Sequence, residues 1–175
     1  MTRIQVLSLA LLSLLLTSGR PPQALPAAKP VAAQPFRVPV TARLAELNPH
    51  LTPGQLERIE AAVHRSASKY GLAPELVVAV IEVESSGKPW AHSPRGALGL
   101  MQVMPYMIRP MGMAGNPSTV EANIEAGCAI LAGNIRRLGE NDGISAYFWG
   151  GNIRGADYLN RVNAARERLE TELHS

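Results

Sequence analysis

The segment from Pro74 to Gly87, PELVVAVIEVESSG, constrains the fold more than any other part of the chain. Leu, Val, Ala and Ile fill nearly every position from 76 to 83, so a helix here is apolar on almost all sides. Pro74 suits the first position of a helix, and Gly87 is a plausible C-terminal stop. A helix of this kind belongs in the centre of a domain, with the other elements around it.

The last turn of this helix carries Glu82 and Glu84, where the negative end of the helix dipole disfavours acids. Glu84 continues the apolar column of Val77 and Val80, whereas Glu82 lies on another face and is predicted to be solvated or salt-bridged. Apolar surroundings raise the pKa of a carboxyl group, and a general acid must still be protonated near neutral pH. Glu84 is therefore the candidate catalytic acid, and the alternative is a surface acid at a frayed helix end.

The N-terminal part divides by composition. Residues 1–19 combine a basic start with the Leu-rich run Ile4–Leu16, which is short for a membrane span and typical of a signal peptide. An uncleaved N-terminal anchor is the alternative. Residues 20–45 are predicted to be a Pro/Ala-rich flexible tether, and residues 46–175 the folded domain. We therefore expect an exported, periplasmic protein, either released or tethered to the inner membrane.

Charge and histidine spacing exclude several classes of function. Three of the 17 Lys and Arg residues precede residue 31 and none of the 14 Asp and Glu does, so the remainder is balanced at 14 of each. This balance removes the charge-based case for nucleic-acid binding. The four histidines are scattered without metal-ligand spacing, and no phosphate-binding loop is present, so we expect no metal and no cofactor. Cys128, the only cysteine, is predicted to be buried filler.

Helical periodicity dominates the rest of the chain, which predicts a mainly α, single helical domain with little or no sheet. Thr52 and Gln55 form a capping-box pattern, which starts a helix ending near Tyr70 with Gly71 as its stop. The further predictions are helices from Pro74, over 97–103, from Ser118 or Thr119 to about Leu138, over 144–149 and over 156–173, with an irregular stretch over 104–117.

Four spaced blocks resemble one known family. They are Glu84-Ser85, the loop SPRGALGLMQVMP over residues 93–105, Asn123-Ile124-x-x-Gly127, and Ala146-Tyr147 with Gly150 followed by Tyr158-x-x-x-Val162. Together they resemble the soluble lytic transglycosylase family over roughly residues 55 to 165. The resemblance implies a lysozyme-like fold of the goose type. It also implies cleavage of the β-1,4 bond between N-acetylmuramic acid (MurNAc) and N-acetylglucosamine (GlcNAc), so the glycan strand of peptidoglycan is the expected partner.

The resemblance also implies a mechanism with one carboxyl group, whereas most glycosidases use two. Glu84 would protonate the glycosidic oxygen and then take the proton of the muramic 6-hydroxyl as that hydroxyl attacks the anomeric carbon. The product is a 1,6-anhydro sugar. An intramolecular nucleophile has a high effective concentration, which removes the need for a second carboxylate.

By position, five residues match family residues around the acid. Ser93, Gln102 and Met104 match residues that line the cleft, Tyr147 matches the tyrosine that helps to hold the acid, and Gly99 would allow close approach of a sugar chain. The structural alternatives are turn chemistry for Ser93, core packing for Met104 and the neighbouring Met101, and an ordinary half-buried aromatic for Tyr147. Gln102 is polar within an apolar segment, so a bonded or substrate-facing role is predicted for it. Trp90 and Trp149 are either sugar-stacking or packing residues.

Two residues depart from the family pattern. Phe148 replaces the usual Asn after the tyrosine, and Ile130 replaces a common Tyr. These changes keep two alternatives open, namely a lysozyme-type hydrolase that uses Glu84 with water, and an inactive wall-binding or secretion-assembly scaffold. Small size and an export signal also suggest, by analogy, a secretion or conjugation apparatus as partner.

Overall fold

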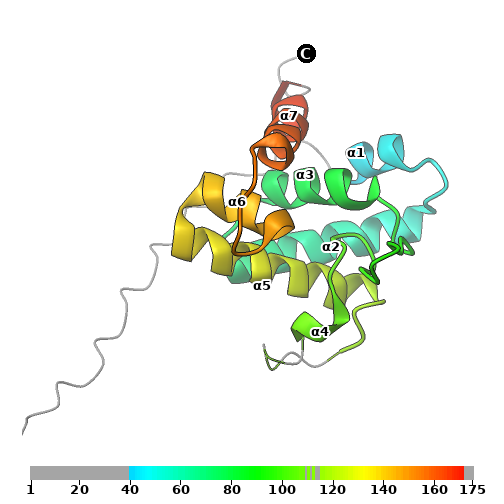
Figure 1. Ribbon diagram of the computed structural model, residues 1–175. Coiled ribbons are helices and arrows are strands. Elements are labelled where there is room, and N and C mark those ends of the chain that lie inside the picture. Colours follow the sequence, from blue (N-terminus) through cyan, green and yellow to red (C-terminus); the bar gives the residue numbers. More distant parts are fainter. Residues whose placement is uncertain (1–39, 109, 111, 113–114, 172–175) are drawn as a thin grey trace, which may run out of the picture.

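A computed structural model describes residues 40–108, 110, 112 and 115–171 of the chain. In this part the chain forms seven helices and, instead of a sheet, only isolated bridges that join Leu98 to His92 and to Val103 (Figure 1). The helices are α1 (Val40–Leu47), α2 (Pro53–Tyr70), α3 (Pro74–Ser85), α4 (Pro105–Ile108), α5 (Val120–Leu138), α6 (Glu140–Trp149) and α7 (Asp157–Thr171). The predicted mainly α fold is confirmed.

Helix α3 is the centre of the core, as its composition predicted. All six residues from Leu76 to Ile81 are buried, five of them completely. Figure 1 shows α3 between α7 on one side and α2 on the other, and α2 in turn packs on α5. Helix α6 contacts both α5 and α7.

Capping residues set the ends of α2 and α3. Thr52 and Gln55 form the predicted capping box at the start of α2, and Gly71 ends it in the left-handed conformation (φ 68°). Helix α3 begins at Pro74 as predicted but ends at Ser85, because Ser86 already adopts the left-handed cap (φ 53°). The predicted stop, Gly87, follows this cap and also has positive φ.

The predicted boundary at residue 46 falls inside helix α1 and is wrong. Val40 and Leu44 on this helix are completely buried in the core cluster. Their i, i+4 spacing puts both on one face, and this apolar face outweighs the Pro- and Ala-rich composition just before it. Residues 40–45 of the predicted tether therefore belong to the packed domain. The predicted signal segment, 1–19, and most of the tether lie outside the described residues.

The segment 97–103 is not helical, which corrects another prediction. Leu98 exchanges both of its backbone hydrogen bonds with Val103, and the residues between them form a tight turn. Gly99 (φ 73°) and Gln102 (φ 47°) both lie in the left-handed region, where a right-handed helix cannot continue. The short helix α4 begins at Pro105, where we expected a break.

Helix α6 starts at Glu140, four residues before the prediction. Gly143 allows this start because a Cβ there would lie 2.5 Å from the backbone of Ile135 on α5. The polar residues of its first turn carry no apolar periodicity, so the sequence did not reveal this earlier start. None of the helices among the described residues is both long enough and apolar enough to cross a membrane.

Candidate active site

Glu84 lies in the last turn of α3, half-buried against α7. The hydroxyl of Tyr158, near the start of α7, donates a hydrogen bond of 2.7 Å to its Oε1 atom. Burial raises the pKa of Glu84, whereas the Tyr158 hydrogen bond and the positive charge of Arg161 partly oppose this rise. The net pKa is raised, as predicted from the apolar column on α3. Such a carboxyl group can give up a proton near neutral pH and accept one afterwards.

Glu82, two residues earlier, has a different environment. Its carboxylate accepts hydrogen bonds from Arg43 of α1 at 2.9 Å and from Arg168 of α7 at 2.6 Å. The side chains of Glu82 and Arg43 are only 12% and 11% exposed, so this pair is largely shielded from water. The prediction of a salt-bridged Glu82 is confirmed.

The side chain of Asn123 on α5 forms three hydrogen bonds with backbone groups of the segment between α3 and α5. Its Nδ2 group donates to the carbonyl oxygens of Leu98 (2.7 Å) and Pro117 (2.9 Å), and its Oδ1 atom accepts from the N–H of Met101 (2.8 Å). A Cβ on Gly99 would lie 2.5 Å from the Asn123 side chain. Glycine is therefore required here by a protein side chain and a positive φ, and contact of Gly99 with a sugar remains a prediction.

Ser93 and Gln102 hold the same loop from within. The Oγ atom of Ser93 accepts a hydrogen bond from the N–H of Ala97 (2.9 Å), which is turn chemistry. The Gln102 side chain donates to the carbonyl oxygens of Gly99 (2.9 Å) and Ala91 (3.3 Å). Gln102 thus has hydrogen-bond partners within the loop, which is one of the two roles predicted for it, and substrate contact by either residue remains a prediction.

Tyr147 does not make the contact expected of it. Its hydroxyl donates to the carbonyl oxygen of Met101 (2.8 Å), and the hydrogen bond to Glu84 comes from Tyr158 instead. The pKa of Tyr147 is raised by burial and by the negative charge of Glu84, so the ring still lies near the acid. Met101 is completely buried, as predicted, against Gly127 on α5, whereas Met104 is half-buried. Through its hydrogen bond to the Met101 carbonyl, Tyr147 joins the loop to α6.

Tyr158 is the site residue that sequence reasoning missed. It shares an apolar face of α7 with Val162, Ala165 and Leu169, and this periodicity indicates a core residue. The ring is indeed buried, and only the hydroxyl carries the polar function. Its block in the family pattern was the one available signal.

Phe148 is stacked on Tyr158, with ring centroids 5.1 Å apart and planes 14° from parallel. The ring of Trp149 lies nearly perpendicular to that of Phe148, with the two centroids 4.9 Å apart. Phe148 is 50% exposed and Trp90 59%, whereas Trp149 is half-buried. The other departure from the family pattern, Ile130, packs against the core.

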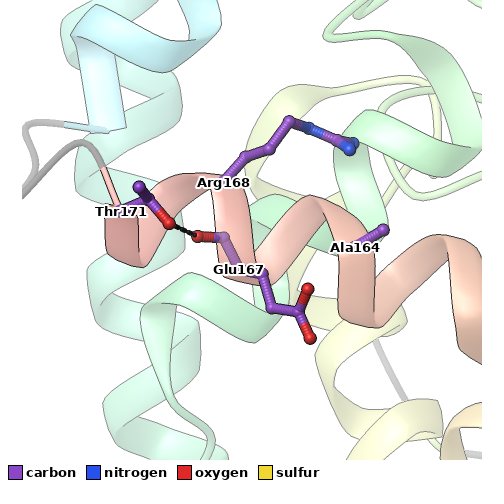
Figure 2. Close-up of a pocket in the computed structure, with 4 residues that line it drawn as sticks. All are labelled: Ala164, Glu167, Arg168 and Thr171. Carbon is purple, nitrogen blue, oxygen red and sulfur yellow. Dashed lines mark hydrogen bonds between the residues drawn. The ribbon is translucent and has the colours of Figure 1, made fainter.

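A shallow recess elsewhere on α7 is separate from Glu84. Figure 2 shows its lining residues, Ala164, Glu167, Arg168 and Thr171, all on the C-terminal half of that helix. Arg168 is ten residues from Tyr158, about 15 Å along a helix. Its side chain already pairs with Glu82. Among the described residues, no group of three or more His, Cys, Asp or Glu side chains is placed to hold a metal ion.

Comparison with known proteins now defines the class. Residues 61–169 match the family model described as the transglycosylase SLT domain, which covers more than half of the chain. The chain therefore belongs to this family, and its all-helical fold is the lysozyme-like fold implied by the sequence resemblance.

Individual relatives are longer proteins. A transglycosylase of Enterobacteria phage PRD1 is 40% identical over 88 residues, which are 50% of this chain and 33% of the phage protein. Membrane-bound lytic murein transglycosylase C of Yersinia pestis (strain Pestoides F) is 39% identical over 80 residues, 40% of this chain and 22% of that protein. An inactive mutant of the lytic transglycosylase Slt from Pseudomonas aeruginosa aligns at a TM-score of 0.45 and 24% identity, covering 62% of this chain and 22% of its own. The chain thus spans a third or less of the length of these relatives.

Proposed function

We propose that this domain is a peptidoglycan lytic transglycosylase, with Glu84 as its single catalytic acid and base. The observation that carries the proposal is the state of Glu84, whose carboxyl is half-buried at the end of α3, has a raised pKa and is oriented by the Tyr158 hydroxyl. Membership of the SLT family and the names of the phage and Yersinia relatives support the substrate class.

The chemistry follows from one carboxyl group used twice. Protonated Glu84 donates its proton to the oxygen that links MurNAc C1 to GlcNAc C4, and the C1–O bond breaks as GlcNAc leaves with its 4-hydroxyl restored. The 6-hydroxyl oxygen of the same MurNAc bonds to C1 and gives its proton to the Glu84 carboxylate. The products are 1,6-anhydroMurNAc and a shortened strand, and the enzyme is reprotonated without water.

The loop over residues 93–105 is the proposed substrate-binding segment beside this acid. Ser93, Gly99, Gln102 and Met104 belong to it, and Tyr147 holds it through Met101. Three sets of hydrogen bonds, from Asn123, Gln102 and Tyr147, keep its backbone in one conformation. A fixed loop reduces the entropy lost when a glycan strand is positioned against the acid.

We place the protein in the periplasm on its Leu-rich N-terminal segment, either released or held at the inner membrane by that segment. Its proposed partner is the glycan strand of peptidoglycan. Local opening of the wall for a secretion or conjugation apparatus is the corresponding biological role.

Product masses test the chemistry directly. Purified sacculi are digested with the native protein and with E84Q, and the released muropeptides are analysed by mass spectrometry. We expect anhydro-muropeptides, which are one water lighter than hydrolysis products, from the native protein and almost none from E84Q. Release of reducing ends would show a lysozyme-type hydrolase instead. Equal release by both proteins would remove Glu84 as the catalyst, and no release by either would favour a wall-binding or assembly scaffold.

A further inference from the structure

Phe148 is an exposed aromatic ring connected to the acid by two contacts. One face of the ring lies on Tyr158, and Tyr158 donates its hydroxyl to Glu84. Tyr158 itself is only 1% exposed, so Phe148 forms the outer layer of this stack. Tyr158 covers one face of the ring and Trp149 packs nearly perpendicular to it, and half of the Phe148 surface still remains exposed.

Packing alone does not account for this arrangement. A phenylalanine that served only to cover Tyr158 would be expected to bury most of its own apolar surface, whereas half of Phe148 stays in water. Single exposed apolar residues are common on protein surfaces, but this one is layered on the hydroxyl donor of the proposed catalytic acid. A flat apolar face at this position is a suitable platform for a ligand that reaches Glu84.

The chemistry of the face indicates the ligand. The face of an aromatic ring is slightly negative and apolar. A pyranose ring presents C–H groups on its faces and hydroxyl groups around its rim, so a sugar can lie flat on Phe148 while its rim stays in water. The side-chain amide of an asparagine, which the family pattern places here, offers hydrogen bonds but no such face.

We propose that Phe148 is a sugar-stacking residue of the substrate cleft, which binds an N-acetylated pyranose of the glycan strand next to the bond that Glu84 cleaves. The inference rests on the proposed function, since it takes the glycan strand as the ligand. It adds a binding contact that is apolar and directional, in place of a polar one. Phe148 contributes to binding the strand and not to proton transfer.

Measuring ligand binding in a variant that cannot cleave the strand tests the Phe148 contact separately from catalysis. In the E84Q background, Phe148 is changed to Tyr, Leu or Ala, and binding of the GlcNAc tetramer is measured by isothermal titration calorimetry. F148Y keeps the aromatic face and should bind within about twofold of E84Q. F148L keeps apolar volume against Tyr158 but loses the face, and F148A loses both, so each should bind about fivefold to tenfold more weakly.

A purely structural role predicts a different pattern. If Phe148 only supported Tyr158, F148A with an intact Glu84 would change the pH profile of muropeptide release, while F148L and F148Y in the E84Q background would bind the tetramer equally. Equal affinity of F148L and F148Y, or no measurable binding by E84Q itself, would overturn the inference. The proposed function fails separately, when the native protein releases no anhydro-muropeptides from sacculi.

Discussion

On one face of the last turn of α3, the Glu82 carboxylate accepts hydrogen bonds from Arg43 and Arg168. On another face, two residues later, the Glu84 carboxyl accepts one from the neutral hydroxyl of Tyr158. Both acids lie at the C-terminal end of the helix, where the helix dipole disfavours negative charge. Glu82 is compensated by two cations and joins α1 and α7 to α3, so it contributes to stability. Among the residues that the structure describes, none forms such an ion pair with Glu84, and its pKa stays raised, which is the condition for proton transfer.

Removing the acid should separate these roles most clearly. E84Q should lower the rate of anhydro-muropeptide release about 10²- to 10⁴-fold. The same change should stabilise the fold at alkaline pH. Because the folded-state pKa of Glu84 is raised, ionisation costs stability as pH rises from the unfolded-state pKa through the folded-state pKa, and Gln avoids this cost. Thermal unfolding of both proteins at pH 4 and pH 9 measures the effect, and a lower stability of E84Q at pH 9 would contradict it.

The matched change at the neighbouring acid should have the opposite result. E82Q removes the carboxylate that Arg43 and Arg168 share, whereas Arg43 keeps its pair with Glu46. We therefore expect a loss of about 2 kcal/mol in the free energy of unfolding, between the values for exposed and buried pairs. At a temperature where the variant is folded, muropeptide release should stay within about threefold of the native rate. Urea denaturation measures the free energy of unfolding, and a release assay on the same preparation measures the rate of muropeptide release. A large loss of activity with unchanged stability would reverse the two assignments.

A change at Tyr158 tests how its hydroxyl sets the pKa of Glu84. Y158F keeps the ring under Phe148 but removes the hydroxyl that favours the charged form of Glu84, so the pKa of Glu84 should rise further. The alkaline limb of the pH–rate profile, where activity falls as Glu84 ionises, should move to higher pH. Loss of orientation should also lower the maximal rate about tenfold, as for one hydrogen bond to a charged group. Y147F is the control, since its hydroxyl contacts Met101 and its loss should leave the position of the limb unchanged.

Arg161 should give the smallest effect. Its positive charge lowers the pKa of Glu84, but the side chain is exposed and its influence is screened by salt. R161Q should therefore move the alkaline limb slightly upward, by less than Y158F, and the shift should shrink as NaCl is raised from 50 to 500 mM. A shift toward lower pH, or one that is insensitive to salt, would mean that Arg161 acts by contact and not by charge.

The two acids also show how far sequence reasoning extends. Helical periodicity distinguished Glu84 from Glu82 because both assignments depend on one helix and its own spacing. The start of α2 followed from its capping box for the same reason, since Thr52 and Gln55 interact locally. Tyr158 was missed because its contact with Glu84 crosses 74 positions of sequence, and its place in an apolar stripe of α7 predicts only burial.

The remaining errors have local physical causes. Segment 97–103 has helix-forming residues, but left-handed conformations at Gly99 and Gln102 and the hydrogen bonds of Asn123 give it a turn. Helix α1 was assigned to the tether because its apolar pair, Val40 and Leu44, directly follows a Pro- and Ala-rich stretch. In each case a tertiary contact decided between local preferences that were nearly balanced.

The hydroxyl that orients Glu84 is supplied by α7, the last helix among the described residues. A nascent or proteolysed polypeptide that stops before Asp157 contains the acid and its loop but has neither Tyr158 nor the Arg168 that pairs with Glu82. Under the proposed function, Glu84 is therefore oriented for proton transfer only in a polypeptide that extends through α7.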